Sequence, residues 1–424
     1  MSKSMDSFDD RALLRTLFDT AIEAARPASV LPRVLPPKPE SGRVAVVAVG
    51  KAAAAMAGAL ENAWGPCEGI ALTRYGHILP TRQIEVIEAA HPVPDQAGGD
   101  AAARILALAS SLGDGDTLVV LISGGASALL SMGLDGINLE DKAALTRALL
   151  TSGATIAEMN TVRRHISALK GGRLAAAAYP ARCLSFAISD VPGDRPEMIG
   201  SGPTVADPTT QADARAVLEN YGIRPASSIA AILTDPSMET PKPGSEALSR
   251  SEFHLIATPQ MALEAATAVA MLPCYLLGDA IEGEARVAGR VFAGLALAVK
   301  SGKSSLRAPC VLLSGGETTV TLPDRASGRG GRNVEFLMGF AEAISDVDGI
   351  AALAGDTDGI DGAAEVAGAF VDGTTVARAE ALGYTLSAAM RAYDGHGLFA
   401  LLGDQVVTGP THTNVNDFRA IIVR

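Results

Sequence analysis

The sequence predicts an α/β protein of two domains, each with a mainly parallel sheet. The first observation is length, because 424 residues exceed what one hydrophobic core usually serves. The second is an alternation of short apolar stretches with alanine-rich stretches, which is typical of strands joined by helical crossovers. The third is a repeated motif, since an apolar stretch is followed by Ser-Gly-Gly at 123–125 and again at 314–316. We expect one copy in each domain.

Composition limits the classes of partner. Lys and Arg number 35 against 47 Asp and Glu, and the net charge of −12 argues against nucleic acid or an anionic membrane. The four cysteines form no Cys-x-x-Cys pair, so neither a zinc site nor a disulfide framework is indicated. No apolar run reaches the roughly 18 residues of a membrane span. We therefore expect a cytoplasmic protein.

The first elements follow from periodicity. Ser7 and Asp10 are placed for a capping box that begins an N-terminal helix, whose apolar face is formed by Leu13, Leu14, Leu17, Phe18, Ala21 and Ile22. A buried strand is expected at 44–49, followed by a turn at Gly50-Lys51 and an alanine-rich helix. Further along, residues 101–112 are expected to be helical.

Two later segments have clear signals of secondary structure. Thr155 and Glu158 form a capping box at the start of a basic helical segment, which Gly171-Gly172 interrupts. The last residues, 418–424, predict a final strand, which could return to the first domain.

Domain boundaries follow from a polar, proline-containing stretch. Residues 236–252 predict a linker between a first domain at 1–235 and a second at 253–424. Both are expected to be Rossmann-like, with the active site in the cleft between them. In such sheets, ligands bind beyond the carboxyl ends of the strands.

The Ser-Gly-Gly turns are candidate phosphate sites, because a glycine turn after a strand exposes backbone N–H groups to an anion. Glu317 makes the second copy different, since its carboxylate would repel phosphate unless a cation lies between them. Thr318 could add a hydroxyl to that copy. A structural turn is the alternative interpretation of both copies. The candidate ligand-binding residues are Ser123, Gly124, Gly125, Ser127, Gly315 and Gly316.

Cations at glycine-rich turns are the next candidates. Lys51 directly follows a predicted strand and one glycine, and Arg332 lies with Arg329 and Asn333 in "SGRGGRNVEF". The planar guanidinium of arginine can donate two hydrogen bonds to phosphoryl oxygens. The alternative interpretation is that these residues lie in a solvated loop without a ligand. Two nucleotide motifs are absent. "VAVGKAAAAM" lacks the later glycines of G-x-G-x-x-G, and "SGKSS" lacks the first glycine of a P-loop.

Clustered acids could hold a divalent cation, because carboxylates close together after a strand suit Mg²⁺. The histidines show no metal-binding spacing, and we expect structural roles for them. The acidic candidates are Asp356, Asp358 and Asp361 in "AGDTDGIDG", and Asp190 and Asp194 in "ISDVPGD".

An ordered set of motifs resembles the class II glycerate kinases, the glycerate 2-kinases whose C-terminal half is called the MOFRL domain. The motifs span about 44–417 and include "VAVGKAAAAM", "HPVPDQAG", "LISGGASALL", "TVRRHISALKGGRLA", "IGSGPTVADPTT", "LLSGGETTV", "GRGGRNVEF", "AGDTDGIDGAAEVAG" and "TGPTHTNVNDF". The resemblance implies ATP-dependent phosphorylation of D-glycerate at its 2-hydroxyl, with Mg²⁺ and a cleft between two domains. It also implies that Lys51 and Arg332 are the catalytic cations.

These implied roles complete the expected site. The first Ser-Gly-Gly turn and Asn333 are expected to bind nucleotide, and Asp190 or Asp358 would orient the 2-hydroxyl or bind Mg²⁺. The expected metal ligands are Asp358, Asp356 and Glu317. The partners are D-glycerate and ATP, and a homodimer is one option for assembly. The alternatives are a hydroxypyruvate reductase that uses NAD(P)H and a non-catalytic phosphosugar-binding module.

Overall fold

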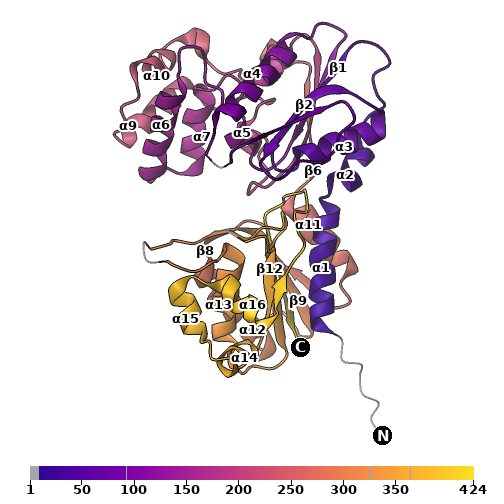
Figure 1. Ribbon diagram of the computed structural model, residues 1–424, viewed down its shortest axis with the longest axis vertical. Coiled ribbons are helices and arrows are strands. Elements are labelled where there is room, and N and C mark those ends of the chain that lie inside the picture. The colour runs from indigo at the N-terminus through magenta and orange to yellow at the C-terminus, as the bar shows by residue number, and fades with distance from the viewer. Residues whose placement is uncertain (1–8, 92, 324–325, 363) are drawn as a thin grey trace. The chain divides into compact units, whose positions relative to one another are not determined.

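The computed structural model describes residues 9–91, 93–323, 326–362 and 364–424. The chain divides into two compact units (Figure 1). One is Pro27–Ile256, and the other joins Ala257–Arg424 to the residues up to Arg26. This division corrects the predicted boundaries, because the N-terminal helix packs in the second unit and 236–252 belongs to the first. No helix in the described residues is long and apolar enough to cross a membrane.

The first unit is built on a six-stranded sheet with the order β3-β2-β1-β4-β5-β6. Strands β3, β2, β1, β4 and β5 run parallel, as predicted. This order is that of doubly wound sheets, in which the switch point lies between β1 and β4. The strands are β1 Val44–Val49, β2 Glu68–Arg74, β3 Glu85–Ala89, β4 Thr117–Ile122, β5 Arg182–Ile188 and β6 Ser251–Ala257.

Helices cover both faces of this sheet, which explains why its strands are almost continuously apolar. Ala45, Val47 and Val49 of β1 share a core with α4 and α8, whereas α3 contacts β1 and β2 from outside that core. Figure 1 shows α3 and α4 on opposite sides of the strands. The helices are α2 Pro27–Val34, α3 Ala53–Trp64, α4 Gln96–Ser110, α5 Ala126–Leu129 and α8 Arg173–Ala178.

Four further helices form a lobe beside the sheet, with a separate apolar core that includes Leu149, Val162, Leu218 and Ile229. The predicted capping box between Thr155 and Glu158 is present at the start of α7. The lobe consists of α6 Leu139–Thr151, α7 Ile156–His165, α9 Gln211–Asn220 and α10 Ser227–Ile232.

A buried polar network fastens this lobe to the segment that was predicted to be a linker. Arg164 of α7 pairs with fully buried Asp207 at 3.0 Å. Glu239 accepts hydrogen bonds from His165 at 3.0 Å and from the Gln211 amide at 2.9 Å, and it pairs with Lys242 at 2.8 Å. Burial alone would raise the pKa of Glu239, but these contacts lower it to about 2. The segment therefore belongs to the first unit.

Replacing Glu239 with glutamine should destabilise the first unit in a pH-dependent way. The folded pKa of about 2 lies below the ordinary value, so the stabilisation is present above that value and is lost as the pH falls through 2. We expect Glu239→Gln to lower the free energy of unfolding by about 2 kcal/mol at neutral pH. Urea titrations should show that this gap narrows between about pH 4 and pH 2. Glu252→Gln, which breaks an exposed pair with Arg182, should cost much less. If the difference in unfolding free energy between wild type and Glu239→Gln did not change with pH, the low pKa of Glu239 would be contradicted.

The second unit has a six-stranded sheet of order β13-β12-β11-β14-β9-β7, and here the expectation of a mainly parallel sheet is wrong. Among the described strands of this sheet, β7 and β9 run parallel, and the other pairs are antiparallel. Strand β14 lies between β9 and β11 and runs opposite to both, and β12 runs opposite to its neighbours β11 and β13. The strands are β7 Cys274–Leu276, β9 Cys310–Ser314, β11 Ile350–Asp356, β12 Gly368–Asp372, β13 Gln405–Val406 and β14 Asp417–Val423.

The final strand was predicted, but its sheet was not. Strand β14 pairs with β9 and β11 in the second unit and does not return to the first sheet. A small separate sheet joins β8 Ile281–Glu284 to β10 Gly316–Thr319 in parallel.

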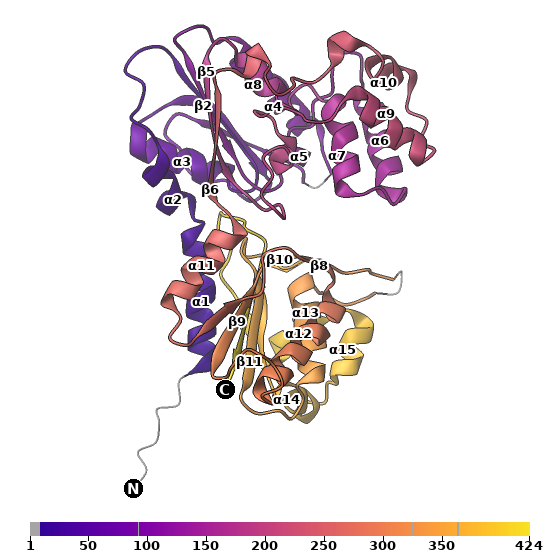
Figure 2. The same ribbon diagram turned by 180° about the vertical axis from the view of Figure 1, so that it is seen from behind.

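Helices cover both faces of the second sheet (Figures 1 and 2). The N-terminal helix is present as expected, but it begins at Asp10 and its cap is Asp9, whose carboxylate accepts from the Arg11 amide at 3.0 Å. The predicted capping box of Ser7 and Asp10 is therefore wrong in its position. Ser7 lies outside the described residues. Helices α1 Asp10–Ala24 and α11 Pro259–Val269 are on one face. The others are α12 Ala285–Lys300, α13 Arg332–Ala343, α14 Thr375–Ala381, α15 Leu386–Ala392 and α16 Gly395–Leu402.

Candidate active site

The first group of predicted residues gathers at the switch point between β1 and β4. The amide of Lys51 donates to the carbonyl of Gly124 at 2.8 Å, and the Ser123 hydroxyl accepts from the Ala52 amide at 3.0 Å. Gly50 has a φ of 123°, and a Cβ there would lie 2.3 Å from the Ser123 hydroxyl. The Lys51 turn and the first Ser-Gly-Gly turn are therefore locked together, and glycine is required at position 50.

The rest of this turn leads into α5. Gly125 adopts the left-handed conformation at φ 83°, and the His91 ring lies against it. The Ser127 hydroxyl lies 2.7 Å from that of Ser201 in the short 3-10 helix Ile199–Ser201, so the protein already provides a partner for it. Asp190 lies two residues beyond β5, at the same edge of the sheet. The predicted residues of the first unit thus share one edge.

Arg332 organises the edge of the second unit. Its Nε lies 2.7 Å from Asp417, one terminal nitrogen lies 2.6 Å from Glu317, and the other lies 2.7 Å from Asp356. Burial opposes the charged form, but the carboxylates of Asp417, Asp356 and Glu317 outweigh it and raise the pKa of Arg332. Asp417 also pairs with Arg419 at 2.5 Å, so two cations among three carboxylates leave a local excess of negative charge. The cation that Glu317 was expected to need is Arg332.

Asp417 is a residue of the candidate site that sequence reasoning missed. Its carboxylate accepts from Arg332, from the Asn333 amide group at 2.8 Å, from Arg419 at 2.5 Å and from the Thr318 backbone amide at 3.3 Å. Asp417 and Arg419 are both buried, and burial lowers the pKa of Arg419. Asp417 begins the last strand, and the polar "NVND" directly before that apolar strand was the available signal.

Asp361, the third acid of its cluster, caps a helix. Its two oxygens accept from the backbone amides of Asn333 and Val334, both at 3.0 Å, at the start of α13. A Cβ on Gly331 would lie 2.3 Å from the Asp361 carboxyl carbon, so glycine is required for this close approach. His396 donates to the Asp361 carbonyl at 2.8 Å, which fits its expected structural role. The charge of Asp361 is thus used to hold α13 and Arg332 in place.

The second Ser-Gly-Gly copy differs from the first in structure. Gly315 donates its amide to the carbonyl of Gly278 at 2.9 Å, and Gly316 begins β10, where it pairs with Ile281 of β8. This copy leads into a strand and has no helix behind it. The second Ser-Gly-Gly turn is therefore not at the start of a helix, and ligand binding by Gly315 and Gly316 stays a prediction.

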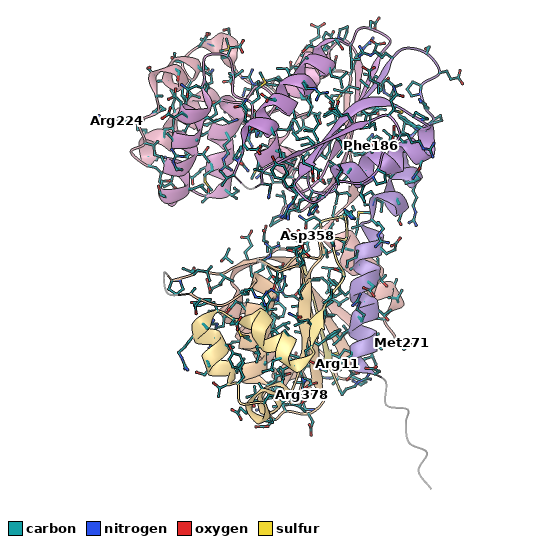
Figure 3. All side chains as sticks on the ribbon, viewed as in Figure 1. Arg11, Phe186, Arg224, Met271, Asp358 and Arg378 are labelled. Carbon is teal, nitrogen blue, oxygen red and sulfur yellow. The ribbon has the colours of Figure 1, made fainter. Side chains whose placement is uncertain are left out.

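Asp356 is the last residue of β11, and Asp358 lies in the loop that joins β11 to β12. One Asp356 oxygen accepts from the Asp358 amide at 3.0 Å, and Asp358 accepts from the Ile360 amide at 2.9 Å. Figure 3 shows Asp358 at one end of the second unit and Arg378 at the other. The described residues contain no group of three or more His, Cys, Asp or Glu arranged to hold a metal ion. Arg329 is exposed, so Arg332 is the arginine of this turn that joins the site.

Comparison with known proteins covers both units. Residues 13–234 match the family described as "Domain of unknown function (DUF4147)", and residues 310–417 match the "MOFRL family". A protein of Agrobacterium vitis named "Putative hydroxypyruvate reductase" is 50% identical over 97% of this chain and 94% of its own length. "D-glycerate 2-kinase" of Thermotoga maritima is 38% identical over 97% of this chain and 98% of its own length. The crystal structure of glycerate kinase from Thermotoga maritima matches with a TM-score of 0.88 over 98% of this chain and 100% of that chain.

The chain belongs to the class II glycerate kinase family. The predicted resemblance is confirmed, and so is the α/β class. Glycerate kinases of this family match the chain across both units, so both edges described above lie within the matched length. The prediction that the active site lies in a cleft between the domains stays a prediction.

Proposed function

We propose that the protein is an ATP-dependent D-glycerate 2-kinase. The 2-hydroxyl oxygen forms a bond to the γ-phosphorus of ATP, the bond from that phosphorus to the β,γ-bridging oxygen breaks, and the hydroxyl proton is released. The products are 2-phosphoglycerate and ADP. The observation that carries this proposal is the full-length similarity to proteins named glycerate 2-kinase. This chain also places Lys51 at the edge of the first sheet and Arg332, with its carboxylates, at the edge of the second.

Phosphoryl transfer depends on positioning and on neutralising charge, with little covalent help from the protein. Lys51 suits this task, because its backbone is held on both sides. Its amide bonds to Gly124, and its carbonyl accepts from His77 at 3.1 Å. We assign nucleotide phosphate binding to Ser123, Gly124 and Gly125. Helix α5 has four residues, so its dipole adds little. The donors would be the N–H groups of Gly124 and Gly125, because that of Ser123 donates to the Val49 carbonyl at 2.9 Å.

Arg332 has a different part in the proposal from the one that the sequence suggested. Its guanidinium nitrogens are paired with Asp356, Glu317 and Asp417, so Arg332 does not offer them to a phosphate group. It instead holds these carboxylates together at the second edge. Asp190 and Asp358 are the candidates for orienting the 2-hydroxyl and accepting its proton.

Mg²⁺ at this edge would be coordinated partly by the protein and partly by the nucleotide. Mg²⁺ is usually held by one or two carboxylates together with nucleotide phosphates. Asp356 ends β11, and its carboxylate accepts a hydrogen bond from the backbone amide of Asp358 at 3.0 Å. Glu317 and Asp356 each give an oxygen to Arg332. Asp356 and Asp358 would therefore hold the ion, with Glu317 beside them. Bound there, Mg²⁺ would neutralise charge on the phosphate oxygens.

A hydroxypyruvate reductase is the second candidate, because relatives that are 50% and 46% identical carry that name with the qualifier "Putative". A reductase needs a nicotinamide site. The turn after β1 has one glycine at Gly50, and alanines follow Lys51, so the dinucleotide fingerprint is absent. A cytoplasmic location and a homodimer stay predictions.

Two parallel assays separate the candidates. One follows ADP release from ATP and Mg²⁺ with D-glycerate, and the other follows NADH or NADPH oxidation with hydroxypyruvate. We expect glycerate-dependent ADP release and no nicotinamide oxidation. Oxidation in the second assay without ADP release in the first would replace the kinase proposal with the reductase.

A further inference from the structure

Three basic side chains of the first unit gather beside the short helix that follows the first Ser-Gly-Gly turn. Lys142 lies on α6, Arg163 lies on α7, and Lys170 lies between α7 and α8. The Lys142 ammonium donates to the carbonyl of Ser131, and the Lys170 ammonium donates to the carbonyl of Leu130. These carbonyls belong to consecutive residues at the end of α5, so the two ammonium groups meet at one place. We call Lys142, Arg163 and Lys170 the basic cluster.

No carboxylate of the described chain forms an ion pair with the basic cluster. Lys170 is only 3% exposed, and a buried cation without an anion is costly. Burial, together with the charge of Arg163, lowers the pKa of Lys142 to about 8, and burial with both neighbouring cations lowers that of Lys170 well below its usual value. Each ammonium has three N–H donors, and the α5 carbonyl takes one of them. The cluster therefore has unused donors and an unbalanced charge.

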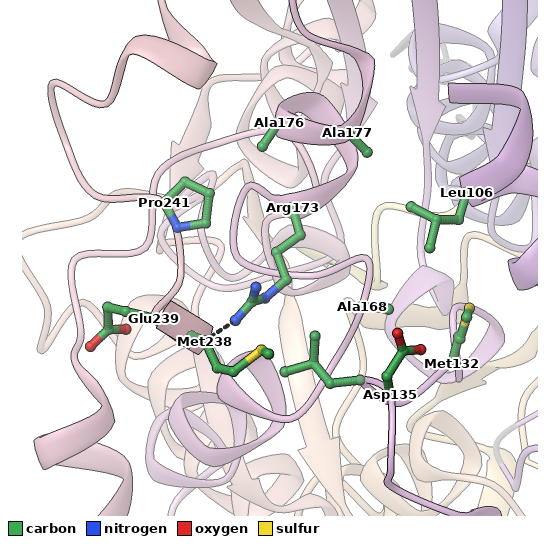
Figure 4. Close-up of a pocket in the computed structure, with 11 residues that line it drawn as sticks. Leu106, Met132, Asp135, Ala168, Arg173, Ala176, Ala177, Met238, Glu239 and Pro241 are labelled. Atoms are coloured by element: carbon green, nitrogen blue, oxygen red, sulfur yellow. Dashed lines mark hydrogen bonds between the residues drawn. The ribbon is translucent and has the colours of Figure 1, made fainter. Parts of the chain in front are cut away.

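Other buried or half-buried cations of the same unit have acidic partners. Arg164 pairs with Asp207 at 3.0 Å, and Lys242 pairs with Glu239 at 2.8 Å. Arg173 lines a cavity of about 350 Å³ together with Glu239 and donates to the carbonyl of Met238 (Figure 4). The charges of Glu239 and Asp207 act on Arg173 as well. In a chain with more acids than bases, three adjacent cations without an acid point to an anionic ligand.

We propose that the basic cluster binds an oxyanion of the substrate, and that this oxyanion is the carboxylate of D-glycerate. The proposal rests on the proposed kinase function. Helix α5 comprises four residues, so its end lies about 6 Å along the axis from the Ser-Gly-Gly turn. Lys142 and Arg163 are half-buried, whereas Lys170 is buried, so an anion would meet the cluster at Lys142 and Arg163. D-Glycerate carries one carboxylate, and the phosphates of ATP are the other source of an oxyanion.

The test is Lys142→Met, which keeps the length of the side chain and removes its charge. The control is Arg147→Met on the exposed face of the same helix. KM is measured separately for D-glycerate and for ATP, and the dissociation constant of D-glycerate is measured by calorimetry without ATP. We expect Lys142→Met to raise both glycerate constants about 10- to 100-fold and to leave KM for ATP within about twofold. Arg147→Met should match wild type.

Two further readouts separate ligand binding from a structural role. The preference of the wild type for glycerate over glycerol, which lacks the carboxylate, should shrink in Lys142→Met by the same factor. The Tm of this variant should equal or exceed that of the wild type, because an unbalanced buried charge is removed. A rise in KM for ATP alone would assign the cluster to nucleotide phosphate and overturn the proposal. If KM and the dissociation constant for D-glycerate were unchanged and Tm fell, the proposal would be overturned. The cluster would then stabilise the end of α5. If wild type binds no glycerate, the proposed function fails instead.

Discussion

Replacing Lys51 with alanine should lower kcat by about 100- to 1,000-fold while the fold stays intact. Loss of one preorganised donor that stabilises transition-state charge typically has this size. The backbone bonds of Lys51 to Gly124 and from His77 do not involve its ammonium, so alanine keeps the turn. Initial rates of ADP release at saturating ATP and D-glycerate, with circular dichroism of the folded variant, provide the measurement.

Lys303→Ala is the matched control for this variant. Lys303 is exposed in "SGKSS" after α12, the stretch that superficially resembles a P-loop. Its loss should leave kcat unchanged. Turnover close to wild type in Lys51→Ala would contradict the assignment of Lys51, and a large loss in Lys303→Ala would mean that the nucleotide phosphates are bound elsewhere.

Arg332→Lys should impair both activity and stability. A guanidinium reaches three carboxylates at once, at 2.7, 2.6 and 2.7 Å, and a single ammonium cannot reproduce this planar geometry. We expect kcat to fall by about 100-fold and the free energy of unfolding to fall by about 2 kcal/mol, because buried Asp417 loses a charged donor. Glycerate kinase assays and urea titrations at neutral pH test both effects.

Arg378→Lys gives the comparison for this second variant. Arg378 pairs with buried Asp404 at 2.6 Å at the opposite end of the unit from Asp358 (Figure 3). Its replacement should lower stability without lowering kcat. If Arg332→Lys lost stability and kept full turnover, Arg332 would be a structural residue, and the second edge would have no catalytic role.

The first unit could be predicted from sequence more fully than the second. Strand β1 was expected at 44–49 and lies at Val44–Val49, because an apolar run between polar turns has one simple interpretation. The directions of the strands in the second sheet could not be predicted in the same way. The pairing of β14 between β9 and β11 depends on contacts between residues about 60 to 110 positions apart, and local pattern carries no signal for them.

The candidate site shows the same limit. Lys51, Ser123 and Arg332 lie in or next to recognisable turns, so they could be predicted from the sequence as candidate site residues. The three-carboxylate environment of Arg332 could not be foreseen, because Asp417 comes from the final strand and Glu317 from β10. The acids at Asp356, Asp358 and Asp361 looked alike in sequence, yet Asp361 caps α13. Partners brought together by tertiary structure decide what each carboxylate does.

The most direct test of the proposed activity is the product of the reaction. Purified protein is incubated with ATP, Mg²⁺ and D-glycerate in the presence of enolase, with no phosphoglycerate mutase. Enolase accepts 2-phosphoglycerate, so phosphorylation at the 2-hydroxyl should give phosphoenolpyruvate at the rate at which ADP appears. ADP release without phosphoenolpyruvate would contradict transfer to the 2-hydroxyl, and no ADP release at all would contradict the kinase.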